Sequence, residues 1–353
     1  MNHRENLLAA MQRKNPKYVP FELRFTPPML SLFKEKTGAD DPAELWDFDY
    51  RAIYFPRPTI RVDYSSYLPD DLPEGTWVDE WGIGNIPGSM HHFSKMVHPL
   101  QNANTVETIF AYPLPDYHHK ECWQSIKPTI AAYHARGYAV IAGLEMTIFE
   151  IGWYLRSMEE LMTDLLLRPE MAEALLDRIT QLRIFQSQIF AGADADILAL
   201  GDDIAMQTGM LLSPKMWRKW FKPRLAAVID AAREIKPGIL VQYHTDGDCR
   251  AVISDLIETG VDILNPVQPE CMDPVAIKKI YGDRLSFSGA IGTQTTLPQS
   301  TPDDVVTAVK TMIDTVGEGG GFLVAPTHVL EPDVPWENVL AFIDAAQKYG
   351  TYK

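Results

Sequence analysis

Short apolar segments alternate along this chain with segments of helical length, and that alternation limits the fold more than any other feature. Strands are predicted at residues 18–25, 138–146, 194–202, 238–245, 261–267, 284–291 and 321–326, with 51–55 as a candidate eighth. The pairs Ser213-Pro214 and Thr301-Pro302 mark helix starts, because each joins an N-cap residue to a proline in the first helical position. Such alternation favours a parallel sheet, and about eight units predict an α/β fold, a (β/α)8 TIM barrel with an insertion.

One region interrupts the alternation. Residues 57–120 are rich in Pro, Asp, Tyr, Trp and His and lack a helical period. Within this region, 59–64 and 76–82 are typical of two hairpin strands around a turn at 69–75. We therefore expect a rim or lid insertion at 57–120 within a single domain of residues 1–353, because no linker or low-complexity segment divides the chain.

Composition narrows the classes of function. A formal net charge of −15 argues against nucleic acid and anionic membranes as partners. Three widely spaced cysteines do not suggest a disulfide framework, so a cytoplasmic location is expected. The first 25 residues suggest an amphipathic helix leading to a strand rather than a signal peptide, and no apolar run is long enough to span a membrane.

Polar residues follow the apolar part of nearly every predicted strand. In a barrel of parallel strands, the C-terminal ends meet at one mouth, and active sites of this fold lie there. Polar groups are costly to bury without partners, so as a set these residues indicate a functional site. The set comprises Glu22, Arg24, Glu145, Asp202, Asp203, Gln207, His244, Asp246, Asn265, Gln268, Gly289, Gln294 and His328.

We assign candidate roles within this set. Glu145 lies in the apolar stretch VIAGLEMTIF, where a carboxylate is costly without a partner. The candidate catalytic residues are Glu145, Asp202 and Asp203, although either aspartate could instead cap a helix or turn. The candidate substrate-binding residues are Arg24, Gln207, Asn265, Gln268 and Gln294.

The stretch HTDGDC at 244–249 poses a specific question. Residues i and i+2 of a strand point to the same face, so His244 and Asp246 point together if the strand extends that far. They could bind a metal or act as a general acid or base. A third alternative is a turn at Asp246-Gly247, with Asp248 capping the next helix.

Four segments carry a family resemblance. HTDG (244–247), GVDILNPVQ (260–268), FSGAIGTQ (287–294) and the tail 321–339 resemble the uroporphyrinogen decarboxylase superfamily. The resemblance implies a single (β/α)8 barrel domain. It also implies one of two activities, because the superfamily contains porphyrinogen decarboxylases and zinc-dependent methyltransferases that act with corrinoid proteins, coenzyme M or thiols.

The decarboxylase pattern is matched poorly. Those enzymes carry an early Arg-Gln-Ala-Gly-Arg segment, whereas this chain has FELRFTPPM at 21–29, which keeps Arg24 alone. DFDYRAIYF at 47–55 does not match their Phe-Ser-Asp segment well, although His328 falls on the histidine of their Gly-His-Gly segment. The net charge of −15 also suits a substrate with many carboxylates poorly.

The methyltransferase pattern is matched in position but not in ligand type. Those enzymes bind zinc through His-x-Cys and a later cysteine, which fall here on His244, Asp246 and His328. The resemblance implies a zinc site of these three residues, with Glu145 as a candidate additional ligand, that is harder than a thiolate site. Such a metal suits activation of an ether oxygen or a water, and loss of the metal is the alternative.

The segments DEWG (79–82) and GDDIAMQTG (201–209) resemble a subgroup often found near corrinoid proteins. The resemblance thus implies a methyltransferase, monomeric or homodimeric, that moves a methyl group from a small methylated ether or amine to a corrinoid protein. A cofactor-free decarboxylase and a non-catalytic small-molecule binder are the alternatives.

Overall fold

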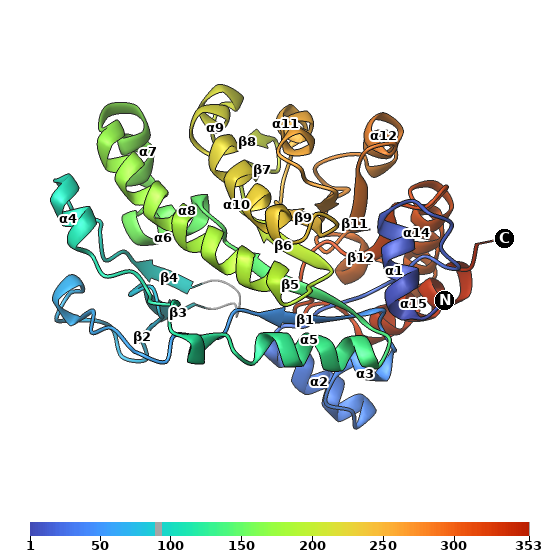
Figure 1. Cartoon of the computed structure of the whole chain (residues 1–353). Helices are drawn as coiled ribbons and strands as arrows, with labels where there is room; N and C mark the ends of the chain where they lie inside the picture. The colour runs from blue at the N-terminus through green and yellow to red at the C-terminus, as the bar shows by residue number, and fades with distance from the viewer. Residues whose placement is uncertain (89–93, 353) are drawn as a thin grey trace.

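The computed structural model describes residues 1–88 and 94–352 and is built around one curled parallel sheet (Figure 1). Its seven strands, in sheet order, are β1 (Tyr50–Tyr54), β5 (Ala139–Glu145), β6 (Ile197–Gly201), β9 (Leu240–His244), β10 (Ile263–Asn265), β11 (Ser286–Ile291) and β12 (Phe322–Pro326). Every neighbouring pair is parallel. The predicted α/β class and TIM-barrel-like sheet are confirmed, and the candidate strand at 51–55 is one of the seven.

The segment predicted as the first strand, 18–25, does not form a regular strand. It runs beside β12 as an extended chain, held by isolated parallel bridges from Phe21 to Val324 and from Phe25 to Leu330. The Val324 N–H donates to the Pro20 carbonyl at 2.9 Å. Pro20 has no N–H to donate in return, which interrupts the ladder.

Helices surround the sheet (Figure 1). The longer ones are α1 (His3–Met11), α2 (Pro27–Thr37), α5 (Ile126–Ala135), α6 (Phe149–Arg156), α7 (Met158–Leu167), α8 (Pro169–Gly192), α9 (Pro214–Trp220), α10 (Lys222–Ile235), α12 (Pro274–Tyr281), α14 (Pro302–Thr315) and α15 (Trp336–Tyr349). The shorter ones are α3 (Pro42–Leu45), α4 (Val106–Ala111), α11 (Ile253–Glu258) and α13 (Thr296–Gln299). Ser213 and Thr301 cap α9 and α14 as predicted, each through its side-chain oxygen. No helix in the described ranges is both long and apolar enough to cross a membrane.

Helix α1 covers the N-terminal ends of the strands. Its buried residues Leu7 and Met11 pack against the first residues of β5, β6 and β9, namely Ala139, Ile197 and Leu240. This apolar contact fills one end of the sheet. The large cavity lined by polar side chains lies at the other end, where the strands finish.

The insertion at 57–120 differs from the predicted hairpin. Residues 59–64 form no strand, and β2 (Trp77–Val78) pairs with β3 (Gly84–Pro87), which pairs with β4 (Ser94–Val97). Residues 89–93 lie outside the described part of the insertion. The turn forms at 79–82 because the Asp79 carboxylate accepts the N–H groups of Trp81 and Ile83 at 2.9 and 3.0 Å. These local bonds decided the strand pairing, and the Pro-Asp-Asp segment at 69–75 did not.

Gly82 makes this turn possible. Its φ of +81° is costly for other residues, and an added Cβ would lie 2.2 Å from the Tyr112 hydroxyl and 2.5 Å from the Tyr64 ring. Tyr112 is fully buried and its hydroxyl donates to the Trp81 carbonyl, so it cannot give way easily. The turn is thereby fixed against the apolar core of the insertion, which also contacts Leu155 of α6.

We expect Gly82→Ala to destabilise the chain by about 3 kcal/mol, from backbone strain and steric overlap together. Gly38→Ala is the matched control, because Gly38 also has a positive φ, +73°, but no atom within 4 Å of an added Cβ. It should cost only about 1 kcal/mol. Denaturant unfolding of both variants measures the difference, and equal losses would contradict the described packing.

Candidate active site

A cavity of ≈ 760 Å³ lies at the C-terminal ends of the strands. It receives side chains from the ends of β5 and β9 and from the segments after β6, β10, β11 and β12, and α6 and β4 complete its wall. Seven residues singled out in the sequence line it: Glu145, Asp203, His244, Asp246, Gln268, Gln294 and His328. The strand ends therefore bring these polar residues to a common space.

Three of these residues form a compact donor group. One ligand atom from each of Asp203, His244 and Asp246 lies within 4.8 Å of the other two. The Nε2 atom of His244 is 3.7 Å from an Asp203 oxygen and 3.8 Å from an Asp246 oxygen. His244 ends β9, and Asp203 and Asp246 lie two residues beyond the ends of the neighbouring strands β6 and β9, so the three donors come close together.

Asn265 fixes the histidine. Its amide nitrogen donates to the Ser288 carbonyl at 3.1 Å, so its oxygen must face His244 and accept the Nδ1–H at 2.6 Å. The His244 ring then presents its Nε2 lone pair to the two carboxylates. Burial lowers the pKa of His244, but the charges of Asp246 and Asp203 outweigh burial and raise it overall.

The Asp246 carboxylate lacks a partner for one oxygen. Its Oδ1 atom is buried and accepts no hydrogen bond. The pKa of Asp246 is raised to about 6, chiefly by burial; His244 opposes the rise, and the charges of Asp203 and Glu270 contribute to it. The Asp203 Oδ1 atom accepts the Asp246 N–H at 2.8 Å, which fixes the two aspartates relative to each other. An orphaned carboxylate oxygen beside an imidazole lone pair is what a bound cation would satisfy.

The donor set fits a divalent metal such as zinc. Zinc binds imidazole nitrogen and carboxylate oxygen at about 2.0–2.2 Å, which places tetrahedral donors about 3.4 Å apart. The observed separations of 3.7 and 3.8 Å are slightly larger, so a small inward shift of the carboxylates suffices. Three protein ligands also leave a position open for substrate, as in catalytic zinc sites.

His328, a predicted metal ligand, lines the cavity but is not one of the three donors that lie within 4.8 Å of one another. Asp203, predicted as catalytic, takes that place. Glu145 also lines the cavity, and its Oε1 lies 3.8 Å from the Arg24 Nη1 atom, while the Arg24 Nε atom lies 3.9 Å from a Glu22 oxygen. Arg24 is thus shared between two carboxylates beneath the cavity and is absent from its described lining.

Other predicted residues hold the backbone. The buried Asp202 carboxylate accepts the N–H groups of Ile148 and Glu150, each at 3.0 Å, and so caps the start of α6 rather than facing the cavity. Gln268 accepts the Gly247 N–H at 2.7 Å, which shapes the turn after β9. These contacts position the site, and they correspond to the capping role left open for Asp202.

Two glutamines meet at the exposed rim. The Gln207 amide donates to the Gln294 carbonyl oxygen at 2.9 Å. Gln294 lines the cavity, whereas Gln207 is absent from its described lining. The pair joins the segments that follow β6 and β11 at the edge of the mouth.

Sequence reasoning missed Glu150. Its Oε1 accepts the Tyr154 hydroxyl at 2.8 Å and its Oε2 accepts the Asp203 N–H at 3.2 Å. The pKa of Glu150 is raised to about 8, chiefly by burial and then by the charges of Asp202 and Asp203. An acidic residue in the first turn of a helix is common, so only its place directly after an Asp202-capped helix start could have indicated this role.

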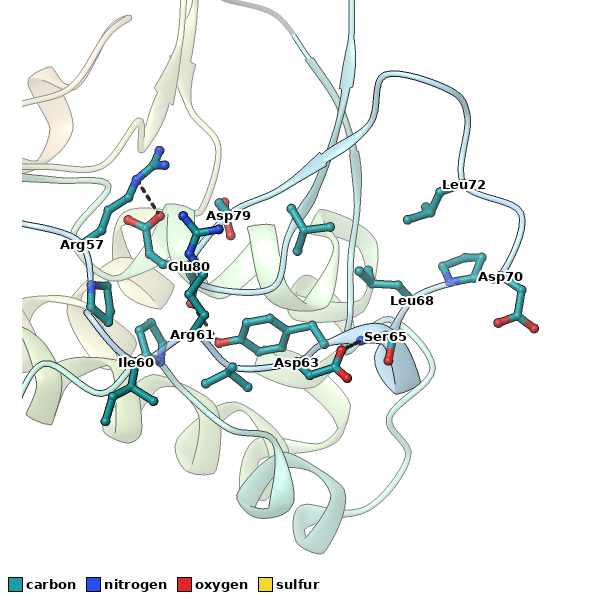
Figure 2. A pocket seen from close by; sticks show the side chains of 16 residues that line it. Arg57, Ile60, Arg61, Asp63, Ser65, Leu68, Asp70, Leu72, Asp79 and Glu80 are labelled. Carbon is teal, nitrogen blue, oxygen red and sulfur yellow. Dashed lines mark hydrogen bonds and ion pairs between the residues drawn. The ribbon is translucent and has the colours of Figure 1, made fainter.

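A second cavity, of ≈ 590 Å³, lies in the insertion (Figure 2). Arg57 pairs with Glu80 at 3.4 Å, and the Asp63 carboxylate accepts the Ser65 N–H at 3.0 Å. The Glu80 carboxylate thus forms an ion pair, and the Asp63 carboxylate stabilises a turn. No cluster of metal donors is found there among the described residues, so the candidate centre is the one at the mouth of the sheet.

Comparisons with known proteins show the family of this chain. Residues 97–349 match the family model described as Uroporphyrinogen decarboxylase (URO-D). Over 182 residues the chain is 27% identical to the methylcobamide:CoM methyltransferase MtaA of Methanosarcina barkeri, which covers 52% of this chain and 50% of that protein. Over 188 residues it is 25% identical to the uroporphyrinogen decarboxylase of Coxiella burnetii (strain Dugway 5J108-111), covering 52% and 49%.

A methyltransferase from Methanosarcina mazei shares the fold, with a TM-score of 0.70 at 18% identity and coverage of 99% of both chains. The chain belongs to the uroporphyrinogen decarboxylase family, as its motifs suggested. It spans about half the length of the curated relatives it matches, and those relatives include both methyltransferases and decarboxylases.

We expect the purified chain to bind about one zinc ion, because three donors lie close together and one of them, the Asp246 Oδ1 atom, accepts no hydrogen bond. Elemental analysis after dialysis measures it. His244→Ala and Asp203→Asn should each remove most of the metal, and Asn265→Ala should weaken binding about 10–100-fold by freeing the imidazole. His118→Ala, at an exposed histidine of the insertion, is the control and should keep the metal. Stoichiometry far below one in the unmodified chain would exclude this centre.

Proposed function

We propose that this chain is a methyltransferase that moves a methyl group from a small methylated substrate, an ether or an amine, to a corrinoid carried by a partner protein. The observation that carries the proposal is the group of Asp203, His244 and Asp246 at the mouth of a large cavity. This group lies where parallel strands end in a member of a family that includes methyltransferases.

A metal held by these residues would act as a Lewis acid on the heteroatom that carries the methyl group. In the reaction the bond from methyl carbon to heteroatom breaks, its electron pair stays on the heteroatom, and the methyl group passes to the nucleophilic corrinoid. Asn265 keeps the His244 lone pair aimed at the site throughout. Glu145 and Gln294, which line the same cavity, would orient the substrate.

The donor types favour oxygen or nitrogen substrates over thiols. The methyltransferases that this chain resembles bind zinc through thiolate ligands, and Asp246 stands at the position of one of their cysteines. Carboxylates leave more positive charge on a metal than thiolates do, and a harder metal prefers ether oxygen or amine nitrogen to sulfur. This argument separates the proposed activity from that of a coenzyme M methyltransferase.

The proposal also covers the fold around the site, the oligomeric state and the docking of the partner protein. The extended segment 18–25 beside β12 occupies the place of an eighth strand, so we propose a (β/α)8 barrel with a rim insertion at 57–120. A monomer or homodimer in the cytoplasm, meeting its corrinoid protein at the mouth, completes the proposal.

The decarboxylase alternative is less well supported. It needs cationic side chains for a substrate with many carboxylates, but Arg24 is shared between Glu22 and Glu145. No lysine or arginine is among the described residues that line the cavity. A non-catalytic binder would have little use for an orphaned carboxylate oxygen beside an imidazole.

Methyl transfer can be measured anaerobically with free cob(I)alamin and a panel of methyl ethers and methylated amines, by following methylcobalamin formation spectroscopically. The unmodified chain should give the product with at least one donor. Asp246→Ala should reduce the rate about 100-fold or more. Asp246→Cys, which restores a thiolate, should keep the metal but favour a thiol ether over an oxygen ether.

Incubation with uroporphyrinogen is the complementary measurement. Formation of coproporphyrinogen without any methyl transfer would replace the proposal by the decarboxylase alternative.

The Gln207→Ala variant removes the contact between Gln207 and Gln294 at the rim of the cavity. We expect it to weaken substrate affinity more than it lowers the rate at saturation.

A further inference from the structure

Arg183, on α8, is a buried arginine that binds the segment joining β5 to α6. The residue is 6% exposed, and its Nε and Nη2 atoms donate to the carbonyl oxygens of Thr147 and Met146 at 3.0 and 2.8 Å. Its Nη1 atom donates to the Gln186 side-chain oxygen at 2.8 Å. These three bonds all go to uncharged oxygens, so the guanidinium holds backbone and amide groups in place.

A guanidinium in this position is costly. Burial lowers the pKa of Arg183, and three neighbours oppose this decrease, namely Tyr117, Asp202 and Glu80. An uncharged side chain of similar size would avoid the cost of burying a charge. The contacts that the guanidinium makes therefore indicate what the residue is used for.

The two carbonyls that Arg183 binds belong to an unusual backbone turn. In an extended strand consecutive carbonyl groups point in opposite directions, so one side chain does not bind both. Met146 has a φ of +56°, a conformation that residues other than glycine rarely adopt. This turn directs both carbonyls toward α8, and Arg183 stabilises it by accepting them as partners.

The segment held in this way forms part of the active-site wall. Glu145 and Met146 line the active-site cavity. Thr147 is fixed to the end of β6, because its N–H donates to the Gly201 carbonyl at 2.8 Å and its Oγ1 accepts the Gly201 N–H at 2.9 Å. The backbone conformation that Arg183 stabilises therefore positions both a cavity wall and a strand end.

Arg183 also contacts the insertion. Its guanidinium carbon lies 5.1 Å from the centre of the Trp81 ring, within the range of cation–π attraction. Trp81 is 5% exposed and belongs to the segment DEWG (79–82), whose turn the Asp79 carboxylate fixes. Asp79 and Glu80 of the same turn line the insertion cavity (Figure 2). Arg183 thus lies between a turn of the insertion and the active-site wall.

We propose that Arg183 is a positioning residue that transmits the conformation of the turn at 79–82 to the active-site wall at 145–150. The turn contacts Arg183 through the Trp81 ring, and Arg183 contacts the wall through the carbonyls of Met146 and Thr147. A displacement of the turn therefore changes the shape of the active-site cavity. The inference applies to any reaction in that cavity, so it goes beyond the proposed function.

Hydrogen–deuterium exchange of the full chain, measured by mass spectrometry, tests this coupling. Backbone N–H groups of the wall segment donate to the Gly201 carbonyl and the Asp202 carboxylate, so they exchange slowly while the wall is in place. Arg183→Met removes the bonds to both carbonyls, and Trp81→Leu removes the ring from the guanidinium. We expect exchange at 145–150 to accelerate about tenfold in Arg183→Met and several-fold in Trp81→Leu.

Arg178→Met is the matched control. Arg178 also lies on α8 and also donates to two backbone carbonyls, but these belong to Ile109 and Tyr112 of the insertion. Its loss should leave exchange at 145–150 unchanged. The conservative variants Arg183→Lys, which keeps a cation, and Trp81→Phe, which keeps a ring, should restore much of the protection, whereas a role in general stability predicts no such local rescue.

A spectroscopic signal from the wall gives a second readout. The methyl resonance of ¹³C-labelled Met146 is assigned as the one lost in Met146→Leu. Trp81→Leu should shift this resonance although the substituted residue lies in the insertion. The resonance of Met312 should not move, because Figure 1 shows α14 far from the insertion.

Two outcomes would overturn the proposal. In Trp81→Leu, faster exchange at 79–82 with unchanged exchange at 145–150 and an unshifted Met146 resonance would show that the insertion and the wall are independent. In Arg183→Met, either unchanged exchange at 145–150 or a uniform acceleration that includes β11 and β12 would show that Arg183 has no positioning role.

Discussion

The site depends on the register of three neighbouring strands. Gly201, His244 and Asn265 are aligned across β6, β9 and β10, so the imidazole and the amide that orients it end their strands at the same level. A Cβ at Gly201 would lie 2.6 Å from the His244 Cβ, so the lack of a side chain there leaves room for the histidine. A one-residue slip would turn the His244 ring to the opposite face of the sheet.

The electrostatics follow from this register. Strand ends bring acidic groups together where burial makes each charge costly, and the raised pKa values of Asp246 and Glu150 reflect that cost. Acidic groups held this close persist only when the surrounding structure fixes them. Here the Asp202 cap on α6 and the contact between the Asp203 carboxylate and the Asp246 N–H do so. The group of Asp203, His244 and Asp246 is thus preorganised for a bound metal ion.

Much of the fold was predictable from the sequence because buried parallel strands leave continuous apolar runs: six of the seven strands of the main sheet lie within predicted segments, and β1 is shifted by one residue from the candidate strand at 51–55. The segment 18–25 was predicted as a regular strand because it is apolar, but Pro20 interrupts its pairing with β12, and only isolated bridges form. The hairpin was misplaced because three-dimensional contacts of Asp79 and Gly82 decided which strands pair.

The candidate site was partly predictable for the same reason. The sequence predicted that His244 and Asp246 point together if the strand extends through Asp246; they do lie close, but β9 ends at His244 and the following turn places Asp246. The third donor was not predictable, because the choice between Asp203 and His328 depends on loop paths after β6 and β12. Glu150 was missed because a glutamate in the first turn of a helix gives no sign of facing a cavity.

The apolar seal made by α1 has a kinetic consequence. Leu7 and Met11 are buried with the first residues of the strands, and the cavity is lined from their C-terminal ends, so we expect ligands to enter at that mouth. Under the proposed function, a macromolecular methyl acceptor must approach through that same opening. The small donor then has to bind first and its demethylated product has to leave last, which makes the reaction a compulsory-order sequence.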